Sequence, residues 1–180
     1  MSSAFRGFAV VAFVAVCSVG QVSIAIAEDR PASRTVVIPA TIPFAEGAYI
    51  PENVKAECDL PARQSEWLAQ GLRSRGYTVI FQQPGDPDQD TATLKVQISS
   101  AFASGNAFIG HSKGMSLSGT LIQNGQKLGS FVAFRKSGGG AFGGFKGSCA
   151  VMIRCAKTLG EDVAKWLEAP TNDARLGSAQ

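Results

Sequence analysis

The most constraining feature of the sequence is a pair of alternating segments joined by Asn124-Gly125. Apolar and small polar residues alternate from Met115 to Leu121, and a further apolar segment runs from Leu128 to Arg135. Period-two alternation is typical of a strand that is buried on one face, and Asn-Gly between two such segments favours a tight hairpin. A third alternating segment, Leu94 to Ile98, precedes them. Together they predict an antiparallel meander in the middle of the chain.

A strand–helix–strand pattern precedes the meander. The β-branched run from Thr35 to Ile38 predicts a buried strand, and Tyr77 to Phe81 predicts a second. Between them, apolar residues recur at helical spacing from Leu60 to Leu72, with Asp59 as the N-cap. A crossover of this kind normally leaves its two strands parallel.

A long amphipathic helix follows the meander, from Cys149 to Leu167, and Pro170 ends it. Helices at both ends of a meander predict an α+β fold, a two-layer sandwich. We expect a mostly antiparallel sheet of about five strands with two helices on one face. Residues 28–170 are expected to form a single α+β domain, and the small, polar residues 171–180 a loose C-terminal tail.

The first 27 residues have the order of a secretory signal peptide. Arg6 is their only charged residue, Phe8 to Val16 is continuously apolar, and Ala25-Ile26-Ala27 is a small-x-small cleavage pattern. The apolar run is shorter than the ~20 residues of a spanning helix, which favours cleavage after Ala27. Lipid attachment at Cys17 is the alternative, but the bulky Val16 is a poor neighbour for it. We therefore expect a periplasmic or secreted protein, peripheral to the membrane at most.

Three cysteines remain after the predicted cleavage: Cys58, Cys149 and Cys155. An oxidising compartment favours pairing. Cys149 and Cys155 lie about 9 Å apart along one predicted helix, beyond the reach of a disulfide. Cys58 must therefore take part. Cys149 is the preferred partner because both residues would lie near helix N-termini, and Cys155 is the alternative.

The formal charge of +3 conceals an uneven distribution. Residues 28–90, 91–160 and 161–180 carry net charges of −4, +8 and −2, and the middle block contains no Asp or Glu. Such a block is either a solvated surface or a binding surface for an anion. Its partner would be an unknown envelope protein or an anionic envelope component, since export and the absence of recognition motifs argue against nucleic acid. We expect an exposed sheet face to carry Lys95, Lys113, Lys127, Arg135 and Lys136.

A glycine-rich segment, Gly138 to Ser148, precedes the last predicted helix. Backbone N–H groups at such a place attract anions, and glycines allow a ligand to approach closely. The P-loop pattern fails because Phe145 stands where its Lys is required. A flexible connection is the simpler interpretation. The candidate binding residues are Lys113, Arg135, Lys136, Gly143, Gly144 and Lys146.

Two other functions are consistent with the residues. Cys149 at a helix N-terminus, with His111, is compatible with a thiol hydrolase. A disulfide at Cys149 would remove that nucleophile, and no Asp or Glu lies between Thr91 and Gly160 to orient the histidine. The other possibility is a small-ligand carrier with an apolar pocket between helices and sheet. A single His and no CxxC motif leave few ways to bind a metal, so neither metal nor cofactor is expected.

Five stretches carry a resemblance to known sequences: Glu57–Pro61, Gly105–His111, Gly139–Cys149, Leu159–Leu167 and Ala174–Gly177. Together they resemble an uncharacterised family of small exported proteobacterial proteins. The resemblance covers nearly all of the chain after residue 27, and its cysteine counterparts imply a Cys58–Cys149 disulfide. It implies a periplasmic location and a small α/β domain, but no activity. The leading hypothesis is a non-catalytic periplasmic binding or adaptor protein of the cell envelope.

Overall fold

The computed structural model describes residues 34–83, 91–106, 110–137 and 148–178. Within these ranges the chain forms three helices and a six-stranded sheet with the order β2-β1-β3-β4-β5-β6. The predicted signal peptide, residues 1–27, lies outside the described residues. The elements are β1 (Thr35–Pro39), α1 (Glu52–Cys58), α2 (Leu60–Ser74), β2 (Thr78–Gln82), β3 (Thr93–Asn106), β4 (Gly110–Gln123), β5 (Gln126–Ser137), α3 (Ser148–Trp166) and β6 (Ala174–Gly177).

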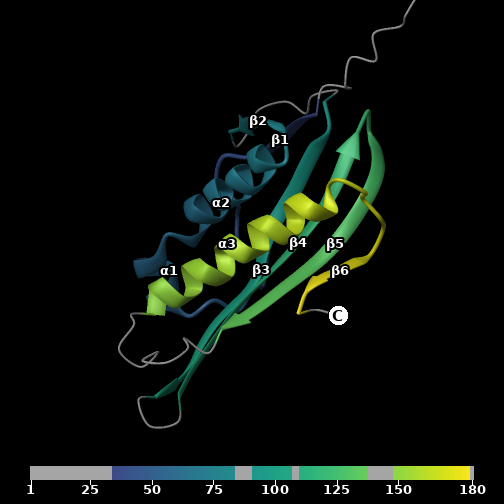
Figure 1. The fold of residues 1–180 in the computed structure, drawn as a ribbon. Helices are drawn as coiled ribbons and strands as arrows, with labels where there is room; N and C mark the ends of the chain where they lie inside the picture. The colour runs from purple at the N-terminus through teal and green to yellow at the C-terminus, as the bar shows by residue number, and fades with distance from the viewer. Residues whose placement is uncertain (1–33, 84–90, 107–109, 138–147, 179–180) are drawn as a thin grey trace, which may run out of the picture. The chain divides into compact units, whose positions relative to one another are not determined.

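The predicted meander forms the centre of the sheet (Figure 1). β3 pairs antiparallel with β4, and β4 pairs antiparallel with β5. Asn124 and Gly125 join the last two strands with φ angles of 50° and 72°, the positive values that a tight hairpin of this type requires. β1 and β2 are parallel, as the strand–helix–strand pattern predicts, and β1 also runs parallel to β3. The α+β fold class is confirmed.

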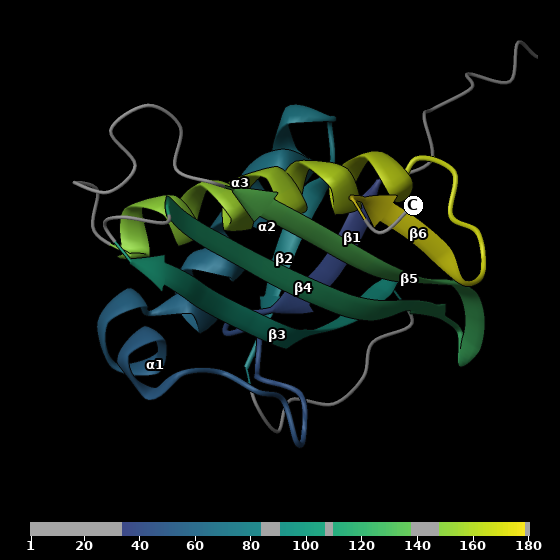
Figure 2. The ribbon, with the colours of Figure 1, turned by 90° about the horizontal axis from the view of Figure 1, so that it is seen from below.

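Helices α2 and α3 lie side by side on one face of the sheet (Figures 1 and 2). They cover a set of apolar side chains that all point to this face and are at most 4% exposed. Burial of such side chains is the main contribution to the stability of this fold. The strand residues of this core are Leu94, Val96, Ile98, Met115, Leu117, Leu121, Phe131 and Ala133.

The C-terminal segment corrects one prediction. Ala174–Gly177 is not part of a loose tail but forms β6, which pairs parallel with β5. The free edge of β5 offers unpaired N–H and C=O groups that a returning chain can satisfy. Ser130 and Asp173 strengthen the junction, because the Asp173 N–H donates to Ser130 Oγ at 2.9 Å and the hydroxyl donates to Asp173 Oδ1 at 3.0 Å. Leu176 also packs against the core.

The start of α2 agrees with the predicted position but not with the predicted contact. Asp59 is the N-cap of α2, yet its side chain makes no capping hydrogen bond. Its φ of 44° is left-handed and separates α2 from the short helix α1. The chain therefore turns sharply at Asp59, and this turn leaves Cys58 buried at the end of α1.

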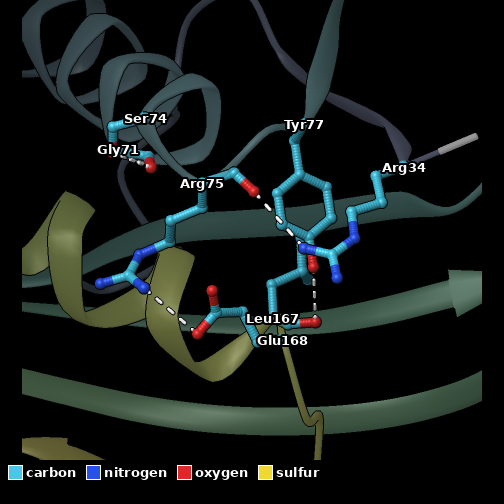
Figure 3. Close-up of polar contacts among 7 residues, drawn as sticks. All are labelled: Arg34, Gly71, Ser74, Arg75, Tyr77, Leu167 and Glu168. Carbon is cyan, nitrogen blue, oxygen red and sulfur yellow. Dashed lines mark hydrogen bonds and ion pairs between the residues drawn. The ribbon is translucent and has the colours of Figure 1, made fainter. Parts of the chain in front are cut away.

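Polar contacts join the last turns of α2 and α3 to the start of β2 (Figure 3). The Tyr77 hydroxyl donates to the carbonyl oxygen of Leu167 at 3.0 Å, and Arg75 pairs with Glu168 at 3.1 Å. The Arg34 guanidinium lies 5.8 Å from the centre of the Tyr77 ring. Burial raises the pKa of Tyr77, so its hydroxyl stays protonated and remains a donor at neutral pH.

Candidate functional site

The face of the sheet opposite α2 and α3 contains a groove of about 1070 Å³, here called the open-face groove. Side chains on this face alternate with those of the core, as expected for residues of opposite parity on a strand. The ends of β1 and β2 border the groove on one side, and β6 borders it on the other. It is lined by Pro39, Thr41, Pro43, Gln82, Gln83, Lys95, Val96, Gln97, Ser118, Gly119, Thr120, Lys127, Ser130, Phe131, Val132, Asp173, Ala174 and Arg175.

Two rows of paired residues cross the groove from strand to strand. The first row consists of Lys95, Thr120 and Ser130, which are direct neighbours on β3, β4 and β5. The second consists of Gln97, Ser118, Val132 and Arg175 on β3 to β6. Within it, Gln97 Nε2 donates to Ser118 Oγ at 3.3 Å. The floor between the charged residues therefore combines amide and hydroxyl groups with the exposed apolar side chain of Val132.

Among the described residues that line the groove, positive charges outnumber negative ones. Lys95, Lys127 and Arg175 are exposed lining residues, whereas Asp173 is the only acidic residue among the described side chains that line it. Asp173 already accepts a hydrogen bond from Ser130. An anion that enters the groove would therefore experience net attraction.

An aromatic pair lies on the same sheet face, beyond the row that ends at Arg175. The rings of Phe102 and Phe134 are stacked with their centres 6.2 Å apart and their planes inclined by 25°. Gly114 makes this arrangement possible, because a Cβ atom there would overlap the Phe102 ring. Lys136 pairs with Gly114 and is exposed beside this aromatic pair.

The structure places the predicted basic residues on two different faces of the sheet. Lys95, Lys127 and Lys136 lie on the open face, as expected, but Lys113 and Arg135 do not. Lys113 is only 4% exposed and points to the helix side of the sheet, as Met115 does. Gly143, Gly144 and Lys146 lie outside the described residues. The prediction of an exposed face that includes Lys113 and Arg135 is therefore wrong.

Arg135 instead joins the sheet to α3. Its Nε donates to Asp162 Oδ2 and its Nη2 donates to Asp162 Oδ1, both at 2.7 Å. The hydrogen bond to Asp162 raises the pKa of Arg135, so the guanidinium keeps its charge at neutral pH. Arg135 contributes to the packing of α3 on β5 and is not available to a partner on the open face.

The alternating pattern itself contained the signal for this correction. Met115 and Leu117 point to the core, so Lys113, two residues earlier, shares their face. Phe131 and Ala133 place Arg135 in the same way. Arg175 is the groove cation that the sequence interpretation missed, because its position depends on the pairing of β6 with β5.

The disulfide joins Cys58 and Cys149, with their Cα atoms 5.1 Å apart. This confirms the preferred pairing and leaves Cys155 as the free cysteine within the described part of the chain. Because the Cys149 sulfur is bonded to Cys58, it is not a nucleophile in this structure. His111 pairs with Gly105 along β4, and its side chain lies outside the described residues. The geometry thus gives no support to a thiol hydrolase.

The thiol of Cys155 is expected to be unreactive in the folded protein. Cys155 is 3% exposed, its Sγ donates to the carbonyl oxygen of Lys113 at 3.9 Å, and burial raises its pKa. Little thiolate is therefore present at mildly alkaline pH.

In the protein comprising residues 28–180, iodoacetamide should modify Cys155 on the order of 100-fold faster after denaturation than in the folded state, because modification of the folded state requires local opening. Peptide mass mapping would contradict this if native Cys155 reacted rapidly, or if Cys58 or Cys149 were alkylated without reduction.

The remaining comparisons concern a small-ligand pocket, a metal site and a membrane-spanning helix. The open-face groove lies on the far side of the sheet from the space between helices and sheet where a small-ligand pocket was expected. Among residues 34–83, 91–106, 110–137 and 148–178, no group of three His, Cys, Asp or Glu side chains is close enough to hold a metal ion. Within those same ranges, no helix has the length and apolar character needed to cross a membrane.

Comparisons with known proteins do not assign a family. No family profile and no curated protein sequence matches the chain. Among solved structures, it is similar to a minor lipoprotein from Acinetobacter baumannii, with 9% identity and a TM-score of 0.43 over 76% of this chain and 94% of that one. A similarity of this size carries no argument about function. The resemblance to an exported proteobacterial family therefore stays a prediction.

Proposed function

We propose that the protein is a non-catalytic binding protein of the bacterial cell envelope, and that the open-face groove holds an anionic partner. The observation that carries this proposal is the charge of the groove: Lys95, Lys127 and Arg175 stand against the single carboxylate of Asp173 among the described lining residues. Surfaces of one sign attract partners of the opposite sign and set the rate of encounter.

The envelope location is supported by two independent features. The first is the signal-peptide pattern of residues 1–27. The second is the Cys58–Cys149 disulfide, a bond that persists in oxidising compartments such as the periplasm and is rare in the reducing cytosol. Both features favour a protein that meets its partner outside the cytosol.

The proposal predicts that reversing the groove charges abolishes binding to the envelope. The variant combines Lys95→Glu, Lys127→Glu and Arg175→Glu, and the measurement is cosedimentation with a bacterial envelope fraction that contains membranes and cell-wall glycans. We expect binding by the unmodified protein to weaken with added salt, and binding by the variant to fall by at least about tenfold.

A matched control changes the same amount of charge on the other side of the molecule. Arg154, Lys157 and Lys165 are exposed on α3, so their combined reversal to Glu should leave cosedimentation nearly unchanged. Equal losses in the two triple variants would show that only net charge matters. Unchanged binding by the groove variant would contradict the proposed function.

A further inference from the structure

We infer that the partner of the open-face groove is an extended acidic glycan, an oligosaccharide that carries carboxylates along its length. This inference rests on the proposed function and names the chemical class of the ligand. Three features of the groove support it: the spacing of its cations, the neutral groups between them, and the aromatic pair that continues its surface.

The cations are distributed along the groove and do not converge on one point. Lys95 and Arg175 stand on β3 and β6, three strand spacings apart and two residues apart along the strands, so their backbones are separated by about 16 Å. Lys127 lies three residues before Ser130 on β5, about 10 Å away along the strand. This placement favours a ligand with several separated charges over one compact anion.

The polar part of the floor between these cations suits hydroxyl groups, and Val132 adds an apolar contact beside it. Gln97, Ser118 and Thr120 present amide and hydroxyl groups that both donate and accept hydrogen bonds, as sugar hydroxyls do. The backbone N–H and C=O groups of β3, β4 and β5 beneath them are already hydrogen-bonded to neighbouring strands of the sheet. An acidic peptide therefore cannot add to this face as an extra strand, which is the mode in which extended peptides usually bind a sheet.

The Phe102–Phe134 pair extends the groove with an apolar surface. Phe134 follows Val132 by two residues on the same face, a distance of about 7 Å along β5. The C–H faces of a sugar ring lose contact with water favourably when they pack on an aromatic ring. Lys136, beside Gly114, adds a positive charge next to this surface. The open face thus alternates charge, hydrogen-bonding groups and an aromatic surface.

The test uses residues 28–180 and four defined probes in isothermal titration calorimetry. The probes are an oligogalacturonate hexamer, its fully methyl-esterified form, a poly-glutamate peptide and vesicles of phosphatidylglycerol with phosphatidylcholine. We expect measurable binding of the oligogalacturonate, with affinity at least about tenfold lower for the neutral ester, because esterification removes the charges that the cations attract.

Substitutions in the groove test whether the oligogalacturonate binds there. Lys127→Gln with Arg175→Gln should lower the oligogalacturonate affinity by about tenfold, and Phe134→Leu by a factor of a few, whereas Arg175→Lys should retain most of it. Lys157→Gln with Lys165→Gln, on exposed positions of α3, is the matched control and should bind normally. Circular dichroism and thermal unfolding of each variant establish that the fold is retained.

The outcomes separate this inference from the proposed function. If poly-glutamate or the anionic vesicles bind in a manner that depends on Lys127 and Arg175 while the oligogalacturonate does not, the glycan inference is overturned and the anionic groove stands. If no probe shows binding that the groove variants weaken, and envelope cosedimentation is also unaffected by charge reversal, both proposals fail.

Discussion

Replacing Cys58 and Cys149 together by Ser is expected to lower the free energy of unfolding by about 4–5 kcal/mol. The disulfide joins residues 91 positions apart, and closing a loop of that length removes about this much chain entropy from the unfolded state. It also ties the end of α1 to the start of α3, two elements that share few other contacts. Urea denaturation should show a large decrease in the midpoint.

Reduction provides the matched comparison. Dithiothreitol should destabilise the unmodified protein to the level of the double variant and should leave the double variant unaffected. Cys155→Ala, which removes a buried thiol but no cross-link, should cost much less, on the order of 1 kcal/mol. A double variant as stable as the oxidised protein would contradict a structural role for this bond.

Substitution of Gly160 is the second change with a large expected effect. A Cβ atom at this position of α3 would lie 2.7 Å from the backbone oxygen of Trp67 and 2.9 Å from the backbone nitrogen of Leu68. Gly71 makes the reciprocal approach, since its Cβ would lie 2.9 Å from the Gly160 oxygen. The two helices therefore cross where both lack side chains, and the atoms that a larger residue would meet belong to the backbone and cannot move aside.

Gly160→Val should accordingly destabilise the protein by about 3 kcal/mol or more, as overpacking forces the helices apart. For Gly160→Ala the direction of the stability change is decisive, because helix propensity alone predicts an increase in the free energy of unfolding of about 1 kcal/mol. We expect a decrease, since the cost of the clash exceeds that increase. Ala150→Val, at an exposed position of α3, is the control and should cost only about 0.6 kcal/mol. Thermal unfolding of a Gly160→Ala variant more stable than the unmodified protein would refute the close contact.

The predicted elements depend on local patterns and were largely correct. Asn124-Gly125 formed the expected hairpin because its residues tolerate the positive φ values that the turn needs. Asp59 began α2 as expected. The short β6 strand was missed because Ala174–Gly177 has no strong strand pattern of its own. Its formation depends on the free edge of β5. There Arg175 pairs with Val132, which lies 43 positions earlier in the sequence.

The candidate site was only partly predictable. A block of basic residues without carboxylates indicated an anionic partner, but net charge along the chain does not say which side of a sheet a residue faces. Alternation with Met115 assigns Lys113 to the covered face, where it is 4% exposed. Arg135 is engaged by Asp162, a residue of α3 that no local pattern of β5 reveals.

The sequence by itself determined the classes of the main elements, the fold class and the choice of Cys58 for a disulfide. These follow from periodicity, turn residues and helix geometry, which act over a few positions. Only the tertiary structure decided that Cys149 and not Cys155 completes the bond, and that Arg175 joins Lys95 and Lys127 at one groove. Those outcomes depend on which distant segments pack together, and packing is set by the whole core and not by any local pattern.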